Sequence, residues 1–292
     1  MCGIVGYIGK KEATNLLVDG LRRLEYRGYD SAGVAVLGAA KGGHSLQVVR
    51  CRGKLSELES LLRADTPLGH VGIGHTRWAT HGRPSDENAH PHCYKTVAVV
   101  HNGIIENYLE LKQGLIERGH EFLSQTDTEI VAHLIQEELE QAPAAQGSAA
   151  APDRLLHATR RALRRIQGAY AIVVLSTETP DEIVCAKNAS PLVLGLGQGE
   201  TFLASDVPAL LPHTRQVIFL EEGDLAQITT QGARVLDLDG NPRQRPVRTI
   251  TWSLITAEKA GFKHFMLKEI HEQSRAVTDT LRGRLSHQPP DA

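Results

Sequence analysis

The sequence predicts an α+β fold in which amphipathic helices pack against antiparallel sheets. Two observations support this prediction. In the first part of the chain, segments with apolar residues at helical intervals, such as 12–24 and 130–139, alternate with short apolar runs. From Ala169 onward, short apolar runs recur with turn residues between them, which is typical of antiparallel strands in one or two packed sheets.

The composition indicates a globular chain with one large domain or two smaller ones. The chain has 292 residues, and 41% of them are hydrophobic, enough for a sizeable core. Lysine and arginine total 32 against 34 acidic residues, a balance that argues against a nucleic-acid or membrane-surface partner. Without a signal peptide or a membrane span, we expect a cytoplasmic protein. Its cysteines lack paired spacing and are expected to be free thiols: Cys2, Cys51, Cys93 and Cys185.

Cys2 stands two residues before the first predicted strand, residues 4–8. If Met1 is removed, this residue carries both a thiol and a free α-amine. An α-amine titrates at about 7.7 to 8.0, so near neutral pH part of it is unprotonated and can accept the thiol proton. The alternative is a chance cysteine at the start of a buried strand, because cysteine is often buried.

A polar aromatic loop follows the predicted helix 12–24. It contains Tyr26, Arg27, Tyr29 and Asp30 within five residues, a composition that fits either a solvated connector or a binding surface. Strands at 32–37 and 46–49 and a short helix at 54–62 come next in the sequence, from the same apolar spacing.

Strand 71–76 leads into a long loop that is rich in hydrogen-bond donors. Arg77 comes directly after the strand, and its guanidinium fork suits the carboxylate of an amino-acid substrate. The loop runs to Lys95 and, with the next strand, supplies four residues that raise a zinc hypothesis: His90, His92, Cys93 and His101. Their spacing lacks the tight pairs of zinc sites, so histidines that brace the loop by hydrogen bonding are the alternative.

Strand 96–101 ends at Asn102 and Gly103. The asparagine amide and the glycine N–H would suit a pair of oxyanion donors, because glycine lets the backbone approach a ligand closely. An ordinary Asn-Gly turn is the alternative. A helix predicted at 109–116, rather than a returning strand, argues against a simple hairpin.

Thr126 and Asp127 precede the predicted helix 130–139. A short polar side chain at this position can cap the helix, and an acid can instead bind a substrate ammonium group. Residues 142–152 predict a variable surface loop, and a helix follows at 154–166. The later apolar runs predict strands at 169–175, 183–186, 192–196, 202–204, 217–220 and 225–228. The glycines of 195–199 indicate a turn, because they lack the spacing of a nucleotide-binding loop.

The last part of the chain changes character. Residues 241–246 are linker-like, 249–252 predict a final strand, 268–285 predict a helix without an evident core, and 286–292 are expected to be disordered. We therefore expect another domain to begin where this sequence ends.

Four motifs together resemble the class II glutamine amidotransferases, which are N-terminal-nucleophile hydrolases. They are Met1 to Gly6 and residues 75–82, 101–107 and 126–129. The resemblance spans about the first 230 to 250 residues, a domain-sized piece. It implies a four-layer αββα sandwich of two antiparallel sheets covered by helices on both sides.

The resemblance also implies roles for individual residues. Cys2 would attack the side-chain amide of glutamine, and Asn102 with Gly103 would stabilise the oxyanion. It further implies that Arg77, Thr80 and His81 bind the α-carboxylate of glutamine and that Asp127 binds its α-ammonium group. Trp78, Arg27 and Tyr29 would form a gate or an interdomain contact. It implies no metal and no organic cofactor.

Residues 24–33 and 263–273 resemble signatures of family members that pass the ammonia to fructose 6-phosphate. On this basis we expect a glutaminase domain at 2–240, a final strand and linker at 241–263, and at 264–292 the first helix of a sugar-phosphate isomerase domain plus a tail. Homo-oligomers would then form only through that further domain. The alternatives are the glutaminase domain of another member such as an amidophosphoribosyltransferase, a silent glutamine-binding module, or a structural interaction domain.

Overall fold

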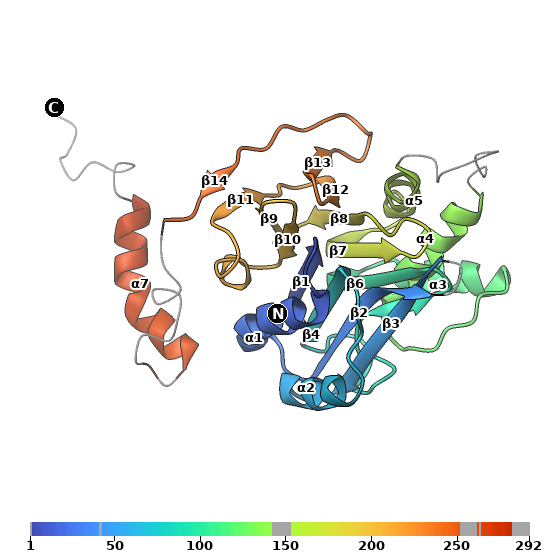
Figure 1. Ribbon diagram of the computed structural model, residues 1–292, viewed down its shortest axis with the longest axis horizontal. Coiled ribbons are helices and arrows are strands. Elements are labelled where there is room, and N and C mark those ends of the chain that lie inside the picture. Colours follow the sequence, from blue (N-terminus) through green and yellow to red (C-terminus); the bar gives the residue numbers. More distant parts are fainter. Residues whose placement is uncertain (1, 41–42, 142–152, 252–261, 263, 282–292) are drawn as a thin grey trace. The chain divides into compact units, whose positions relative to one another are not determined.

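The computed structural model contains two antiparallel sheets (Figure 1). The structure describes residues 2–40, 43–141, 153–251, 262 and 264–281. The chain divides into two compact units, Met1–Ile250 and Thr251–Ala292. Both sheets belong to the first unit. The second contains helix α7 (Phe265–Leu281).

The larger sheet has eight strands. In spatial order they are β14 (Arg248–Thr249), β11 (Gln216–Phe219), β9 (Val193–Leu196), β10 (Thr201–Ala204), β1 (Gly3–Ile8), β4 (Val71–Arg77), β2 (Ser31–Ala40) and β3 (Gly43–Arg52). Every residue of β1 is buried, because one face of the sheet meets helices and the other meets the second sheet. Such burial on both faces explains why β1 appears in the sequence as a continuous apolar run rather than an alternating one.

The smaller sheet has six strands. In spatial order they are β13 (Gly232–Leu236), β12 (Leu225–Thr229), β8 (Ile183–Asn188), β7 (Gly168–Ser176), β6 (Val97–Ile105) and β5 (His92–Tyr94). Apolar side chains of the two sheets, such as Ile4 and Ile73 from one and Val100 and Val173 from the other, form a shared core. This core is the middle of the sandwich.

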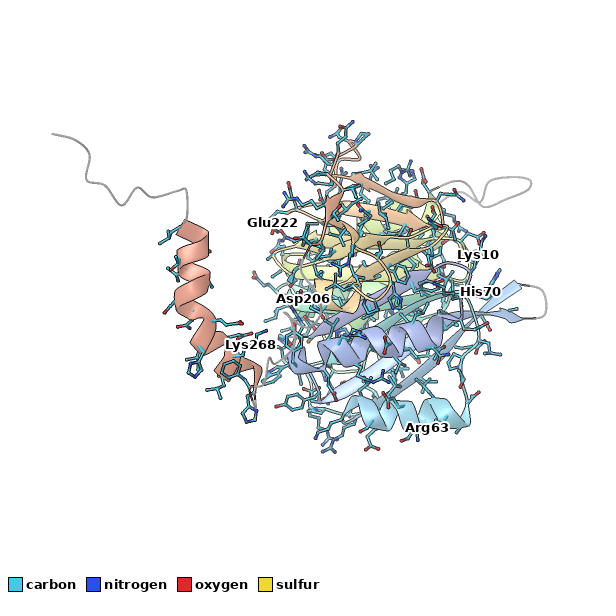
Figure 2. All side chains as sticks on the ribbon, turned by 60° about the vertical axis from the view of Figure 1, so that its left-hand side comes forward. Lys10, Arg63, His70, Asp206, Glu222 and Lys268 are labelled. Atoms are coloured by element: carbon cyan, nitrogen blue, oxygen red, sulfur yellow. The ribbon has the colours of Figure 1, made fainter. Side chains whose placement is uncertain are left out.

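Helices cover both outer faces (Figure 1). Helices α1 (Ala13–Leu24) and α2 (Leu55–Ala64) pack on the larger sheet, and Figure 2 shows them side by side. Helices α4 (Glu129–Gln141) and α5 (Arg154–Leu163) pack on the smaller sheet through a second apolar core, and α3 (Tyr108–Glu117) packs on α4. The prediction of an α+β fold with two antiparallel sheets between helical layers is therefore confirmed.

Strand register brings the segments that contain the predicted site residues to one edge of the sandwich. Gly3 of β1 pairs with Thr76 of β4, so the residue before β1 lies beside the residues that follow β4. In the other sheet, Asn102 pairs with Ala171 and Gly103 with Tyr170.

Several predicted boundaries differ from the structure. Strand β6 continues through Asn102 and Gly103 to Ile105, so the interpretation of these two residues as an ordinary turn is wrong. Strands β5 and β13 were not predicted, because these short edge strands give no continuous apolar run. The helix predicted at 154–166 ends at Leu163, and the one predicted at 268–285 is α7. The predicted loop at 142–152 and tail at 286–292 lie outside the described residues.

Within the described part of the chain, no helix is both long enough and apolar enough to cross a membrane.

Candidate active site

A cavity of about 450 Å³ opens at the edge where β1, β4 and β6 bring their motifs together. Its size is within the usual range for small-ligand pockets. Its lining residues are Cys2, Arg27, Arg77, Trp78, Thr80, His90, His101, Asn102, Gly103, Ile104, Glu106, Thr126, Asp127, Thr128, Ala169, Ser190 and Pro191.

Cys2 is held at the wall of this cavity from three sides. The Trp78 N–H donates to Cys2 Sγ at 3.2 Å, and the thiol lies 3.5 Å from the Trp78 carbonyl oxygen. The Cys2 carbonyl oxygen accepts hydrogen bonds from Arg27 Nε at 3.2 Å and Asn102 Nδ2 at 3.0 Å. Burial raises the pKa of the Cys2 thiol, and the Trp78 N–H and nearby positive charge only partly offset this effect. The thiol therefore needs a base before it can act as a nucleophile.

Asn102 presents its NH2 group to Cys2 while its oxygen is engaged behind the cavity. Asn102 Oδ1 lies 2.9 Å from His75 Nε2, on the neighbouring sheet. The next residue, Gly103, has φ of +143°, and a Cβ atom there would lie 1.9 Å from the Ala169 carbonyl oxygen. Only glycine fits this position, since any side chain would collide with the backbone of β7.

The Arg77 guanidinium faces the cavity from the end of β4. Its Nη2 donates to the carbonyl oxygens of His81 and, at 3.1 Å, Gly82, which closes the loop that follows the strand. Its Nη1 is buried and has no hydrogen-bond partner among the described residues. Burial lowers the pKa of Arg77 from its usual value, but the group stays charged. A charged, buried and half-paired fork is suited to a carboxylate.

Thr80 and His81, both predicted to bind the substrate carboxylate, are placed differently in the structure. Thr80 lines the cavity. His81 is not among the lining residues, and its ring packs on Tyr108 with ring centroids 5.3 Å apart. His81 is connected to the site through its backbone oxygen, which accepts from Arg77.

Asp127 also lines the cavity and is 4% exposed. Its Oδ2 accepts a hydrogen bond from the Ile105 N–H at 2.9 Å, so this carboxylate is directed at β6. Thr126 is likewise directed away from α4, because its hydroxyl lies 2.9 Å from His92 Nε2. Neither side chain therefore needs helix capping to explain its position.

The loop after α1 lies beside the cavity and contributes Arg27 to its wall. The Trp78 and Tyr29 rings are half exposed and contact each other edge to face, with centroids 5.5 Å apart. Arg27 is buried beside Cys2 and forms an ion pair with Asp206 at 3.0 Å; Asp206 is labelled in Figure 2. The Tyr26 hydroxyl also donates to Asp206, at 2.7 Å. The loop is therefore built into the site rather than being a solvated connector.

The histidines of the zinc hypothesis bind protein groups. His90 Nδ1 lies 3.1 Å from His75 Nδ1, His92 Nε2 lies against the Thr126 hydroxyl, and His101 Nδ1 lies 2.9 Å from Thr128 Oγ1. No group of three potential ligands among the described residues is arranged to hold a metal ion. The arrangement matches histidines that brace the loop by hydrogen bonding.

The structure thus brings most of the predicted site residues to a single cavity. Sequence reasoning missed the segment Ser190–Pro191 in the cavity wall. It also missed two residues that hold lining side chains from outside the cavity: His75, which contacts Asn102, and Asp206, which pairs with Arg27. His75 had a usable signal, since a polar residue inside the fully buried strand β4 needs a polar partner. Asp206 had none, because its partner Arg27 is 179 residues away in the sequence.

Comparisons with known proteins agree with this site. Residues 75–212 match the model of a family described as a glutamine amidotransferase domain. A solved glutamine phosphoribosylpyrophosphate amidotransferase from B. subtilis covers 83% of this chain at 26% identity, with a TM-score of 0.66; this chain covers 50% of that one. The chain belongs to the class II glutamine amidotransferases.

Curated relatives within this family are glutamine–fructose-6-phosphate aminotransferases (isomerizing). One from Thermus thermophilus is 55% identical over 288 residues, and one from Haemophilus influenzae is 48% identical over 288 residues. These alignments cover 98% and 99% of this chain but only 45% of each relative. The chain therefore spans less than half the length of these relatives and covers only their glutaminase part.

Proposed function

We propose that the chain hydrolyses glutamine to glutamate and ammonia through a covalent intermediate on Cys2. The observation that carries this proposal is the presence of Cys2, Asn102, Arg77 and Asp127 in the wall of one cavity. Arg77 and Asp127 offer the opposite charges that the α-carboxylate and α-ammonium of an amino acid require. Thr80 adds a hydroxyl to the carboxylate side, and His81 holds Arg77 through its carbonyl oxygen.

The chemistry begins when the Cys2 α-amine, freed by removal of Met1, takes the thiol proton. The thiolate attacks the amide carbon of glutamine, and the carbonyl oxygen becomes an oxyanion. Asn102 Nδ2 has a second hydrogen to donate beside Cys2, and the Gly103 N–H is the second donor. Collapse breaks the C–N bond, the leaving nitrogen takes the proton from the amine, and ammonia departs. Water then cleaves the thioester and releases glutamate.

In a longer enzyme, the ammonia would pass to fructose 6-phosphate and yield glucosamine 6-phosphate. The names of the relatives support this assignment, and their identity of up to 55% exceeds the 26% to the phosphoribosylpyrophosphate enzyme. Trp78, Tyr29 and Arg27 would form the gate and the contact with the second domain. This chain by itself would release the ammonia to solvent, and formation of glucosamine 6-phosphate by the 292-residue chain would contradict that division.

Mass spectrometry tests the mechanism directly. After Met1 removal, an electrophile that mimics glutamine should label Cys2 and leave Cys51, Cys93 and Cys185 unmodified, and glutamine should protect Cys2. The matched control is a chain that retains Met1, which should hydrolyse glutamine at least about 10³-fold more slowly, because the general base is missing. Equal activity of both forms, or labelling of another cysteine, would refute the mechanism.

A further inference from the structure

Three buried imidazoles lie in a row, and the middle one, His90, lines the cavity. His75 on β4 is fully buried, and His90 and His92 in the adjoining loop and β5 are at most 5% exposed. The ring centroids of His75 and His90 are 4.2 Å apart, and those of His90 and His92 are 4.7 Å apart. The first of these rings contacts Asn102, which donates to the oxyanion in the proposed reaction.

The partners of His75 determine which of its nitrogens carries the hydrogen. His75 Nε2 lies 2.9 Å from Asn102 Oδ1 and 3.1 Å from the His101 carbonyl oxygen. Both oxygens can only accept, so Nε2 must be the donor. Burial lowers the pKa of His75 to about 3, so the ring is neutral near pH 7 and its Nδ1 has no hydrogen.

The contact with His75 determines which nitrogen of His90 carries the hydrogen. Its Nδ1 lies 3.1 Å from the bare Nδ1 of His75 and must therefore donate to it. Burial, and then the neighbouring His75, hold the pKa of His90 well below its usual value, so this ring is neutral as well. The hydrogen bonds then run in one direction, from His90 to His75 and from His75 to Asn102.

This direction decides how the Asn102 amide is oriented. The oxygen and nitrogen of an amide are nearly equal in size, so packing alone does not select one orientation. With Oδ1 facing the His75 donor, Nδ2 faces Cys2, whose carbonyl oxygen it reaches at 3.0 Å. If the amide were flipped, its NH2 group would face the His75 N–H, and two donors would meet without an acceptor between them. The amide oxygen would then face the oxyanion, which it would repel.

We propose that His75 is a positioning residue for Asn102: its Nε2–H fixes the amide so that the NH2 group faces Cys2, while the His101 carbonyl oxygen and the His90 N–H support the His75 tautomer that carries hydrogen on Nε2. This inference rests on the proposed glutamine hydrolysis. It assigns His75 and His90 to the oxyanion site, although His75 does not line the cavity.

Kinetics of substituted chains test the proposal. His75→Leu should lower kcat for glutamine hydrolysis by about 10²-fold, the loss typical of one oxyanion donor, and change KM by less than about threefold. His75→Gln should restore kcat to within about tenfold, because its amide can donate from the same place. The control is His213→Leu, since His213 stacks on Phe202 and does not line the cavity. A His75→Leu chain with unchanged kcat, or with its loss mainly in KM, would overturn the proposal.

A double-mutant cycle separates positioning from a general structural role. If His75 acts through Asn102, then His75→Leu should cost less than about twofold in an Asn102→Ala chain. A loss in that chain as large as in the parent chain would show that His75 acts by another route, and the proposal would be wrong.

Nitrogen NMR of histidine-labelled protein provides a test that does not depend on activity. The His75 signal should report hydrogen on Nε2 and the His90 signal hydrogen on Nδ1, and neither should titrate between about pH 5.5 and 9. The signals are assigned by their loss in His75→Gln and His90→Gln chains. Hydrogen on His75 Nδ1 in an active chain would overturn the proposed hydrogen-bond order from His90 to His75 to Asn102. If the expected tautomers are found in a chain that does not hydrolyse glutamine, the hydrogen-bond order is supported and the proposed hydrolysis is contradicted.

Discussion

Two buried charges of opposite sign face the same cavity from different elements. Arg77 lies at the end of β4, and Asp127 lies just before α4. Each is partly paired with backbone groups, so each is fixed in place yet keeps polar atoms for a ligand. The negative charges of Asp30 and then of Asp127 help to keep the Arg77 guanidinium charged against the effect of burial. At the scale of single residues, this pair would select an amino acid in the proposed reaction.

Replacement of Arg77 tests this selection. Arg77→Met should lower kcat/KM for glutamine by about 10²-fold, because a charge-assisted hydrogen bond to the α-carboxylate is lost. Hydrolysis of 4-aminobutanamide, which lacks that carboxylate, should fall much less. Steady-state kinetics on both substrates measures the difference, with Arg63→Met on the exposed end of α2 as the control. Equal losses on the two substrates would mean that Arg77 serves the fold rather than the substrate.

Glu129 holds the loop that contains Asp127. Its carboxylate accepts hydrogen bonds from the N–H groups of Leu123 at 2.8 Å and Ser124 at 2.7 Å and from the Ser124 hydroxyl at 2.6 Å. Burial alone would raise the pKa of Glu129, but the nearby His133 ring and the hydrogen bonds from Ser124 and Leu123 outweigh burial and lower this pKa to about 2.

Glu129 should therefore make the free energy of unfolding depend on pH in the acidic range. Because its pKa is lower in the folded chain than in the unfolded chain, the ionised group stabilises the fold at neutral pH, and this contribution is lost as the pH falls from about 4.5 toward 2. Glu129→Gln should lower the free energy of unfolding by about 2 kcal/mol at pH 7, with a smaller difference from the parent chain at pH 3. Urea unfolding at both pH values measures this, with the exposed Glu110→Gln as the control. A difference that does not depend on pH would contradict the assignment.

At the scale of elements, the site depends on pairing between β6 and β7. Strand β6 carries both proposed oxyanion donors, and its partner β7 supplies the Ala169 carbonyl oxygen that excludes a side chain at Gly103. An Asn-Gly pair in the sequence usually indicates a turn. Here the glycine instead lets two strands approach beside a ligand cavity.

Alanine at Gly103 should damage both fold and activity. Gly103→Ala combines a positive φ of +143° with a contact of 1.9 Å to backbone, so we expect a loss of more than about 3 kcal/mol of stability and of measurable hydrolysis. Gly232→Ala is the matched control, because φ is +125° there and nothing lies within 4 Å of the added Cβ. It should cost about 1 kcal/mol. Equal thermal shifts for the two chains would argue against the backbone collision.

At the scale of the whole molecule, every residue that lines the cavity belongs to the unit Met1–Ile250. Both sheets and the two apolar cores between and beside them belong to it as well. Helix α7 of the second unit leaves several large apolar side chains exposed: Met266, Leu267, Ile270, Val277 and Leu281. The first unit should therefore be sufficient for folding and hydrolysis.

A chain that ends at Ile250 tests this sufficiency. It should keep its melting temperature within about 3 °C and its kcat/KM for glutamine within about twofold, because it retains the apolar cores and the whole cavity. Calorimetry and steady-state kinetics measure both values. A chain that fails to fold, or loses most of its activity, would show that residues 251–292 contribute to the first unit.

Much of the fold could be predicted from local patterns. Helices such as α1 were found because their apolar residues recur at helical spacing, and strands such as β1 and β7 because burial on both faces makes them continuous apolar runs. Strands β5 and β13 were missed because short strands at sheet edges are held by pairing, which leaves little trace in the sequence.

The sequence by itself determined the chemistry that is available: an N-terminal cysteine, an arginine after a buried strand, an asparagine-glycine pair and an acid before a helix. Only the tertiary structure decided which atoms face one another. The Asn102 NH2 group faces Cys2 because the amide oxygen is held by the Nε2–H group of His75, 27 residues away in the sequence. His81 was expected in the cavity and instead supports Arg77 through its backbone. Hydrogen-bond direction and strand register depend on contacts between distant segments, and local spacing does not encode those contacts.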